Sequence, residues 1–290
     1  VLGDLMHSRM HVCDWAGFDE SLARMKEQVG ESRKVVNPFS VLALTADLAT
    51  LRKAAEVFAL HQRSEAFRLG PVSKRARHDR IRIGYYSADF HEHATAYLMA
   101  ELFELHDKNR FELVAFSFGP ETGDPMRQRL SSAFDRFVDV RLRTDREVAL
   151  LSREMGIDVA IDLKGYTEDS RPGIFACRTA PVQVSYLGFP GTMGVNFMDY
   201  IIADKTLIPT GSQSGYSEKI VYLPNSYQVN DAKRVISSRA FTREELGLPA
   251  SGFVFACFNN TYKITPAVFA AWMRILMRVG DSVLWLFETN

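Results

Sequence analysis

The sequence predicts an α/β fold of the doubly wound class, preceded by an all-helical segment. Up to about residue 70 the apolar residues recur at helical spacing, whereas from Ile81 short apolar runs alternate with helix-period segments. The same alternation begins again near Ser251. Strands that alternate with helices form a parallel sheet covered on both faces, and such sheets bind ligands at the carboxyl ends of their strands. We therefore expect two Rossmann-like lobes, of which the second has only begun when the chain stops at Asn290.

The amino-acid composition limits the classes of function that we expect for this protein. The 290 residues, 47% of them hydrophobic, are enough for two domains with a real core. The 35 basic and 35 acidic residues leave no net charge, so we expect no nucleic-acid partner and no membrane partner. Cys13, Cys177 and Cys257 lie far apart and outside any CxxC pair, which argues against a disulfide framework or a zinc site and predicts a reduced, cytoplasmic setting. No run approaches the roughly 20 apolar residues of a membrane span, and Val1 in place of a methionine suggests a missing N-terminus.

The first 70 residues are predicted to be helical. Phe18, Leu22, Met25 and Val29 share one helical face, and a second face follows the break at Pro38. The members of the second face are Leu51, Ala55 and Phe58. A basic run without interleaved aromatic residues comes next, and we interpret it as a solvated linker rather than a binding patch. The run comprises Lys74, Arg75, Arg77, Arg80 and Arg82.

The segment from residue 81 to residue 204 is predicted to hold most of the first sheet. The predicted strands are IRIGYYSAD (81–89), ELVAFSF (112–118), DVAIDL (158–163), VQVSYLG (182–188) and DYIIAD (199–204). The predicted helices lie near 95–106, 124–134, 145–155 and 171–178. Thr144 with Glu147, and later Thr242 with Glu245, have the pattern of a capping box, so we expect a helix to start at each pair.

Near the C-terminus the sequence predicts one β-α-β unit with a phosphate site in its first loop. Its strands are FVFACF (253–258) and SVLWLF (282–287), and its helix runs from Pro266 to Val279. Thr265 is the expected N-cap, so free backbone N–H groups and the positive end of the helix dipole lie beside Lys263. Such a lysine can neutralise a leaving diphosphate without a metal ion, although a surface lysine in a turn is the alternative.

This β-α-β unit is too small to be a domain by itself. We expect it to expose an apolar face around Val254, Phe255 and Trp285, and to be poorly soluble for that reason.

Two histidines follow the first predicted strand. His91 and His93 lie just before a helix, at the sheet edge where functional side chains gather. A histidine there can take a proton from a hydroxyl or donate a hydrogen bond to a phosphate. The alternatives are a loop or capping histidine, or a metal pair, for which no third ligand is near.

The loop LGFPGTMG (187–194) is a second candidate anion site. Gly191 lets backbone N–H groups approach an anion and Thr192 adds a donor, although a plain turn explains the loop equally well. The loop is neither a Walker loop nor a GxGxxG fingerprint, so nucleotide hydrolysis and dinucleotide-dependent oxidoreduction lose support. Another strand ends in polar residues that either line the crevice or face water. These are Asp162, Lys164, Gly165, Tyr166 and Thr167.

Several blocks, in order, resemble the catalytic region of O-linked N-acetylglucosamine (O-GlcNAc) transferases of the bacterial branch. The blocks are RIRIGYYSADFHEH, DLKGYTEDSRPGIFACRTAPVQVSYLGFPGTMGVNFMDYIIAD, YSEKIVYLPNSYQVND and FNNTYKITPAVFAAWMRILMRVGDSVLWL. They cover residues 80–290, and CDWAGFDESLARMKEQV resembles the stretch that joins these enzymes' tetratricopeptide (TPR) repeats to the catalytic lobes. The resemblance implies a two-lobed glycosyltransferase fold of the B type. It also implies a metal-independent, inverting transfer of GlcNAc from UDP-GlcNAc to Ser or Thr hydroxyls of proteins.

The resemblance assigns roles by motif position. His93 matches the active-site histidine and Lys263 the lysine that holds the donor diphosphate. The remaining donor-side matches are Asn260, Tyr262, Pro190, Gly191 and Thr192. Two positions depart from the family pattern: Ala94 stands where many relatives have proline, and Lys164 replaces a small polar residue.

The resemblance divides the chain into three segments. Residues 1–77 form a helical lead-in that links to upstream TPR repeats, 78–240 the first catalytic lobe, and 241–290 the start of the donor-binding lobe. A later His-Thr-Thr segment of the family lies beyond Asn290, so we expect the fragment to be inactive alone, with protein acceptors bound through the upstream repeats. Two alternatives stay open: a protein O-fucosyltransferase that uses GDP-fucose, and a repeat-docked scaffold without catalysis.

Overall fold

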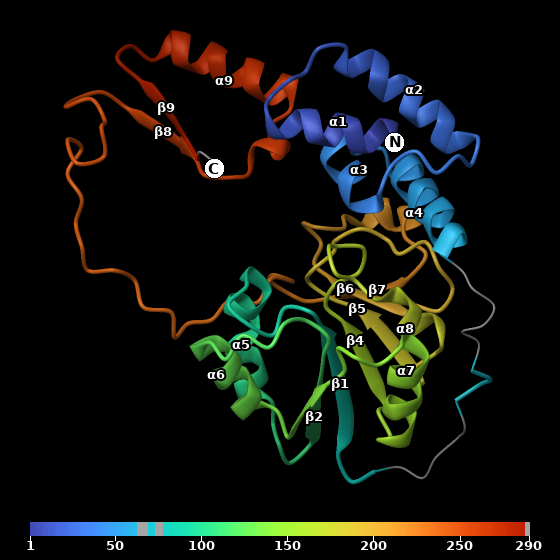
Figure 1. Cartoon of the computed structure of the whole chain (residues 1–290). Coiled ribbons are helices and arrows are strands. Elements are labelled where there is room, and N and C mark those ends of the chain that lie inside the picture. The colour runs from blue at the N-terminus through green and yellow to red at the C-terminus, as the bar shows by residue number, and fades with distance from the viewer. Residues whose placement is uncertain (63–68, 73–77, 288–290) are drawn as a thin grey trace. The chain divides into compact units, whose positions relative to one another are not determined.

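The computed structural model of the chain describes residues 1–62, 69–72 and 78–287 (Figure 1). These residues fall into two compact units. The sheet unit is the continuous segment Asp47–Arg234, and the discontinuous unit combines Val1–Ala46 with Val235–Asn290. The chain therefore starts in the discontinuous unit, builds the sheet unit, and then returns to the first.

One parallel sheet organises the sheet unit. Its described strands are β1 (Ile81–Ser87), β2 (Phe111–Ser117), β3 (Arg136–Asp139), β4 (Val159–Asp162), β5 (Val182–Ser185), β6 (Tyr200–Ala203) and β7 (Lys219–Tyr222). They lie in the order β3-β2-β1-β4-β5-β6-β7, and all of these pairs are parallel. Between β1 and β4 the strand order reverses, and doubly wound sheets bind ligands at the carboxyl ends of the strands beside this reversal, the switch point.

Helices cover both faces of the sheet. The described helices of this unit are α4 (Leu48–Gln62), α5 (Ala94–Leu105), α6 (Pro125–Ala133), α7 (Asp145–Glu154), α8 (Pro172–Ala176) and the 3-10 helix η2 (Thr210–Gly215). Figure 1 shows α5 and α6 on one side of the sheet and α7 and α8 on the other. The predicted capping box starts α7, because Thr144 N–H donates to Glu147 (2.7 Å) and Glu147 N–H donates to Thr144 Oγ1 (3.3 Å). The predicted doubly wound class is thus confirmed.

The core of the sheet unit lies on both faces of β1 and β2. Tyr85 faces the α5 side, where its ring meets Phe103 edge-on at 4.9 Å between centroids. The next residue, Tyr86, stacks on Phe116 at 4.4 Å on the other face, and its hydroxyl lies 2.5 Å from Ser152 Oγ of α7. A strand buried on both faces carries a continuous apolar run, as β2 does from Leu113 to Phe116.

The discontinuous unit joins three N-terminal helices to the predicted β-α-β unit. Its described elements are α1 (Leu2–His11), α2 (Phe18–Gly30), α3 (Pro38–Leu44), β8 (Val254–Cys257), the 3-10 helix η3 (Thr261–Lys263), α9 (Pro266–Arg278) and β9 (Val283–Leu286). The strands β8 and β9 are parallel, which confirms the β-α-β unit. Thr265 caps α9, since its hydroxyl accepts the Val268 N–H at 3.3 Å.

The expected apolar face of this β-α-β unit is present, but its most exposed residues differ from those predicted. Val254, Phe255 and Trp285 are half-buried, because β8, β9 and α9 partly cover one another. Phe253 and Met277 are instead exposed, by 58% and 80%. Among the described residues of α9, none is fully buried.

Two sequence predictions of secondary structure are wrong or incomplete. Thr242 and Glu245 exchange the capping-box hydrogen bonds, but a hydrogen-bonded turn follows in place of a helix. Gly247, at φ +64°, ends that turn only two residues after Glu245, so no second helical turn can form. The short strands β3 and β7, which the sequence analysis does not identify, lie at the two edges of the sheet.

The predicted division of the chain differs from the two units. The helix α4, which falls in the predicted lead-in 1–77, belongs to the sheet unit, where Arg52 Nη1 donates to the Ser214 carbonyl oxygen at 2.8 Å. Lys74, Arg75 and Arg77 of the predicted linker lie outside the described residues. The boundaries 1–77, 78–240 and 241–290 stay a prediction about evolutionary domains.

Candidate functional site

The loops after β1 and β4 meet at the switch point of the sheet. Tyr86 of β1 pairs with Asp162 of β4, so the residues that follow these strands start from adjacent positions at the carboxyl edge. Asp89 and His93 follow β1, and Lys164 follows β4. The strands of a parallel sheet all end at the same edge. The polar loops after β1 and β4 therefore lie at the edge where sheets of this class bind ligands.

A buried ion pair joins the two loops. Lys164 Nζ lies 2.8 Å from Asp89 Oδ1 and 2.9 Å from Oδ2, and the two side chains are only 6% and 8% exposed. Asp162 is also buried, and its Oδ1 accepts the backbone N–H of Lys164 at 2.9 Å. Burial raises the pKa of Asp162 to about 6. Of the two readings that the sequence left open for Asp162 and Lys164, exposure to water is therefore excluded.

His93 caps helix α5 through its ring. Its Nδ1 accepts the Thr95 N–H at 3.2 Å and lies 3.5 Å from Asp89 Oδ2. Burial lowers the pKa of His93, and the neighbouring Asp89 opposes this effect. A neutral ring whose Nδ1 accepts a hydrogen bond carries its hydrogen on Nε2. This half-exposed histidine therefore caps α5 and also lies at the carboxyl edge of the sheet.

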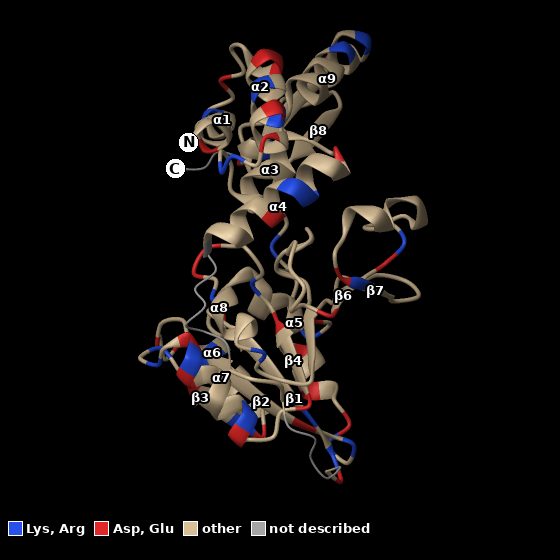
Figure 2. Cartoon of the chain, turned by 90° about the vertical axis from the view of Figure 1, so that its right-hand side faces the viewer, with Lys and Arg blue, Asp and Glu red and all other residues tan. Residues whose placement is uncertain are grey.

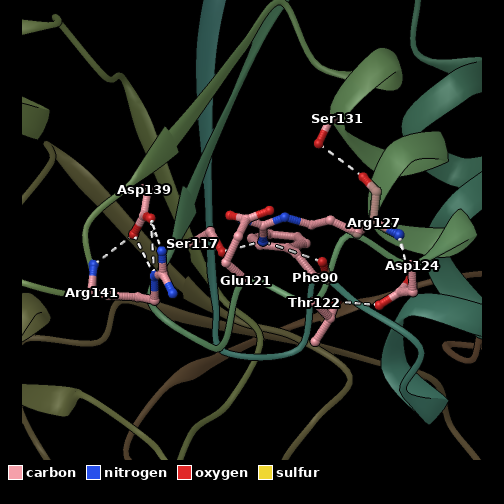
Figure 3. Close-up of polar contacts among 9 residues, drawn as sticks. All are labelled: Phe90, Ser117, Glu121, Thr122, Asp124, Arg127, Ser131, Asp139 and Arg141. Atoms are coloured by element: carbon pink, nitrogen blue, oxygen red, sulfur yellow. Dashed lines mark hydrogen bonds and ion pairs between the residues drawn. The ribbon is translucent and has the colours of Figure 1, made fainter.

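Helix α6 fixes the histidine loop in place (Figure 3). Asp124 at its N-cap accepts the N–H groups of Arg127 (2.8 Å) and Glu92 (3.2 Å). The buried Arg127 guanidinium donates to the Phe90 carbonyl oxygen (3.3 Å) and to Ser117 Oγ (2.7 Å). The loop from Phe90 to His93 is therefore attached at two points to an element that also packs on the sheet.

The loop Pro190–Thr192 is held from inside the sheet unit. Thr192 Oγ1 donates to Glu218 Oε2 at 2.7 Å and accepts the N–H groups of Gly194 and Ser217, each at 3.1 Å. The Thr192 hydroxyl hydrogen is consequently engaged with a buried carboxylate. Its predicted role as an additional anion donor stays a prediction that requires this bond to break.

Gly191 fits the same loop for a steric reason. A side chain at this position would place its Cβ 2.6 Å from the Phe189 ring, so the buried ring would have to shift to admit any residue other than glycine. Pro190 is half-buried, and its carbonyl oxygen accepts the Tyr216 hydroxyl at 2.9 Å. The backbone of the loop is therefore rigidly placed, as an anion-binding loop requires.

The predicted donor loop lies in the discontinuous unit. Asn260 is the N-cap of η3 and Lys263 is its last residue; both are exposed, and Lys263 N–H donates to the Asn260 carbonyl oxygen at 3.0 Å. Tyr262 packs against both histidine rings of α1, with centroid distances of 4.8 Å to His7 and 4.9 Å to His11. Lys263 Nζ lies 5.8 Å from the Tyr262 ring centroid and forms no ion pair with any described residue. Lys263 thus lies directly before Ile264 and Thr265, the N-cap of α9, as the sequence predicts.

The predicted site residues are divided between the two units. His93, Pro190, Gly191 and Thr192 belong to the sheet unit. Asn260, Tyr262 and Lys263 belong to the discontinuous unit. The sequence analysis missed Asp89, Glu218 and Arg127, although an acidic residue four positions before His93 at a strand end is a signal that could have identified Asp89.

Charge is mixed over both units. Figure 2 shows Lys and Arg interspersed with Asp and Glu on each of them, in keeping with the zero net charge. Within residues 1–62, 69–72 and 78–287, no three His, Cys, Asp or Glu side chains converge as metal ligands would. None of the described helices combines the length and apolar character needed to cross a bilayer.

The fold defines an α/β protein of the Rossmann-like type, and some of the candidate site residues lie at the carboxyl edge of its sheet, where sheets of this class bind ligands. The comparisons make the class specific: the chain belongs to glycosyl transferase family 41, which matches residues 12–241 and 235–289. The chain is 33% identical over 304 residues to the probable UDP-N-acetylglucosamine–peptide N-acetylglucosaminyltransferase SEC of Arabidopsis thaliana. That match covers 98% of this chain and 31% of the relative.

Two further similarities agree with this family. A UDP-N-acetylglucosamine–peptide N-acetylglucosaminyltransferase of Caenorhabditis elegans is 35% identical over 158 residues, which are 54% of this chain and 14% of that protein. The solved structure of a lysine-to-methionine mutant of the Thermobaculum terrenum O-GlcNAc transferase matches with a TM-score of 0.77 at 27% identity. It covers 97% of this chain and 53% of that one, and it confirms the predicted glycosyltransferase fold of the B type. The chain thus spans about a third of the Arabidopsis relative and half of the Thermobaculum chain.

Proposed function

We propose that the protein containing this chain transfers GlcNAc from UDP-GlcNAc to Ser or Thr hydroxyls of proteins, with inversion and without a metal ion. The relatives that the chain matches are named for this reaction. The observation that carries the proposal is the free Lys263 cation beside the capped N-terminus of α9, in a chain of this family. A nucleotide sugar and protein acceptors are then the partners, with acceptors bound through upstream TPR repeats in the cytoplasm.

Lys263 has the chemistry that a leaving diphosphate requires. When the hydroxyl oxygen bonds to the anomeric carbon, the bond from that carbon to the phosphate oxygen breaks, the hydroxyl proton passes to a base, and UDP leaves with added negative charge. The ammonium group and the free N–H groups at the start of α9 stabilise this charge electrostatically, as a metal ion would elsewhere. Asn260 and Tyr262 are the proposed donor-side neighbours, and Tyr262 is fixed by its contacts with His7 and His11.

His93 has the chemistry of a hydrogen-bond donor in this reaction. With Nδ1 accepting the Thr95 N–H, the neutral ring presents a hydrogen on Nε2. Such a group binds a phosphate or sugar oxygen better than it accepts a hydroxyl proton. We therefore assign His93 to donor binding and orientation, with the Pro190–Thr192 loop supplying backbone N–H groups to the same substrate.

The proposal is tested on the full-length protein with purified UDP-GlcNAc and an acceptor peptide. Lys263→Ala is expected to reduce UDP binding and transfer by at least about tenfold, because one charge-assisted contact to the diphosphate is worth about 1.5–3 kcal/mol. Lys205→Ala, at an exposed position after β6, is the matched control and should leave both unchanged. Transfer should also persist in EDTA.

Three outcomes would contradict parts of the proposal. Preferential turnover of GDP-fucose would replace the donor. UDP binding with no transfer to any acceptor would favour the scaffold alternative. Loss of transfer in EDTA that returns with a divalent cation would exclude the metal-independent mechanism.

A further inference from the structure

The buried ion pair between Lys164 and Asp89 has no part in the proposed donor chemistry, and this makes its position informative. Both side chains are less than a tenth exposed, so the pair carries a desolvation cost that its own attraction only partly offsets. A buried salt bridge is therefore weak evidence for a purely stabilising role. The pair lies at the switch point, and its Asp89 Oδ2 is 3.5 Å from His93 Nδ1, so its charges act on the histidine.

Asp89 is shared among three neighbours. Lys164 Nζ contacts both carboxylate oxygens, Thr95 Oγ1 lies 3.4 Å from Oδ2, and His93 Nδ1 lies 3.5 Å from the same Oδ2. The Lys164 contacts are the shortest of the set. Asp89 is thus neutralised mainly by Lys164, and His93 stands beside a compensated charge.

We infer that Lys164 is a positioning residue that keeps His93 neutral with its hydrogen on Nε2. Lys164 compensates the negative charge of Asp89, so that carboxylate does less to favour a protonated His93. A protonated His93 would carry a hydrogen on Nδ1, and the Thr95 N–H would then lose its acceptor. The ion pair and the cap at the start of α5 therefore favour the same tautomer.

The other charged groups around His93 are consistent with this assignment. His91 follows the same strand, with its ring centroid 5.9 Å from that of His93, and like Lys164 it lowers the pKa of His93. Asp124 of α6 lies on the far side of this loop, where it interacts with His91 and accepts the Glu92 N–H. Asp162 lies beneath Lys164 and is bonded to its backbone N–H. Among these groups, Asp89 raises the pKa of His93 and Lys164 lowers it, so the two charges have opposite effects on the histidine.

The inference predicts in which direction the His93 titration curve shifts in each of several variants. These shifts are measurable without any substrate. In the 290-residue chain, ¹⁵N-labelled histidine spectra are followed against pH, and the His93 signals are assigned with His93→Gln. Lys164→Met is expected to increase the proton affinity of His93 about tenfold, because it exposes the ring to an uncompensated carboxylate. Asp89→Asn should shift the curve in the opposite direction, since the lysine cation then stands alone.

Two further variants keep the test valid if a single change prevents folding. Asp89→Asn with Lys164→Met removes both charges and leaves a neutral pair, and its His93 curve should return close to that of the unchanged chain. Lys164→Arg retains the cation and should do the same. Lys205→Met is the matched control at an exposed lysine of the same unit, with no expected effect.

The outcomes separate this inference from the proposed function, on which its catalytic meaning rests. An unchanged His93 curve in Lys164→Met, or a double variant that titrates at higher pH than the unchanged chain, would overturn it. If the expected order is found but the full-length protein transfers no sugar, the inference holds and the proposed function fails. In an active enzyme, Lys164→Met should move the acid limb of the kcat/KM profile to higher pH, and Lys164→Arg should restore it.

Discussion

The sheet unit and the β8–α9–β9 segment are made from the same elements, but they differ in burial. In β1, five consecutive residues from Ile83 to Ser87 are buried, whereas no described residue of β8, α9 or β9 is. Between β8 and α9 lies an apolar hollow of about 290 Å³, lined in part by Cys257, Trp272 and Leu276. In the sheet unit, by contrast, Tyr86 and Phe116 pack closely, with their stacked ring centroids 4.4 Å apart.

The two regions agree in their local structure. Thr144 and Thr265 both accept an N–H group at 3.3 Å at the start of their helices, although α7 has buried residues and α9 has none. Local hydrogen bonds and backbone preferences therefore form the elements in both regions. Burial depends on neighbours instead, and only the sheet unit supplies them on both faces.

The largest expected difference concerns large apolar side chains. Phe116→Ala should lower the free energy of unfolding of the sheet unit by about 3–5 kcal/mol, because it removes a stacked, fully buried ring and leaves a cavity. Phe253→Ala, at a position that is 58% exposed, should cost about 0.5 kcal/mol or less. Because two units need not unfold together, hydrogen exchange of each unit during urea unfolding is the measurement. Equal costs at the two positions would refute the comparison.

A smaller effect is expected for the guanidinium that holds the histidine loop. Arg127→Met should destabilise the sheet unit by about 2 kcal/mol, since Ser117 and the Phe90 carbonyl lose a charged donor. Exchange of the Phe90–His93 amides should accelerate together with this loss. Arg136→Met is the matched control, because the Arg136 side chain is 56% exposed. Its ion pair with Glu112 is long, at 3.7 Å from Nε to Oε1, and an exposed pair of this kind contributes little to stability. If the loop amides of the Arg127 variant exchange at the unchanged rate, the loop is held by Asp124 alone.

Helix caps should reveal where the two regions are alike. Thr144→Ala and Thr265→Ala should each cost about 1 kcal/mol, because each leaves one N–H at a helix start without its side-chain acceptor. Thermal unfolding with exchange of the first-turn amides measures both. A cost at α7 with none at α9 would mean that capping stabilises a helix only where tertiary packing already holds it.

The smallest effect is expected from pH in the discontinuous unit. Burial and the neighbouring His11 lower the pKa of His7 relative to its unfolded value near 6.5. The folded unit therefore binds fewer protons, so His7 contributes stability above pH 6.5 that is lost as the pH falls toward the lowered pKa. Exchange of the amides from 259 to 264 should consequently accelerate at pH 5 relative to pH 7, after correction for intrinsic rates. In His7→Gln this dependence should flatten, and a retained dependence would assign it to another group.

Interior strands could be predicted from the sequence, whereas edge strands could not. The runs around β1, β2, β4 and β5 are apolar because helices cover them on both sides. The edge strands β3 and β7 have only one neighbour each and no buried residue, so their apolar signal is weak. The capping pattern at Thr242 likewise predicted a helix that Gly247 prevents.

The positions of candidate site residues could be predicted where a residue follows a strand and precedes a helix. His93 and Lys263 follow strands and precede helices, and the structure places both there. The partners of Asp89 and Glu218 could not be assigned, because Lys164 and Thr192 lie 75 and 26 residues away from them in sequence. Such pairings depend on strand order, which one sequence does not state.

The hydrogen bond from Thr261 to the His11 carbonyl oxygen joins residues that are 250 positions apart. On a ribosome, the helix that ends at His11 emerges long before Thr261 is synthesised. At roughly 5–20 residues per second, that helix waits on the order of 12 to 50 seconds for its partner. During this interval the whole sheet unit can fold, so that unit can be complete before α1 reaches its contact with Thr261.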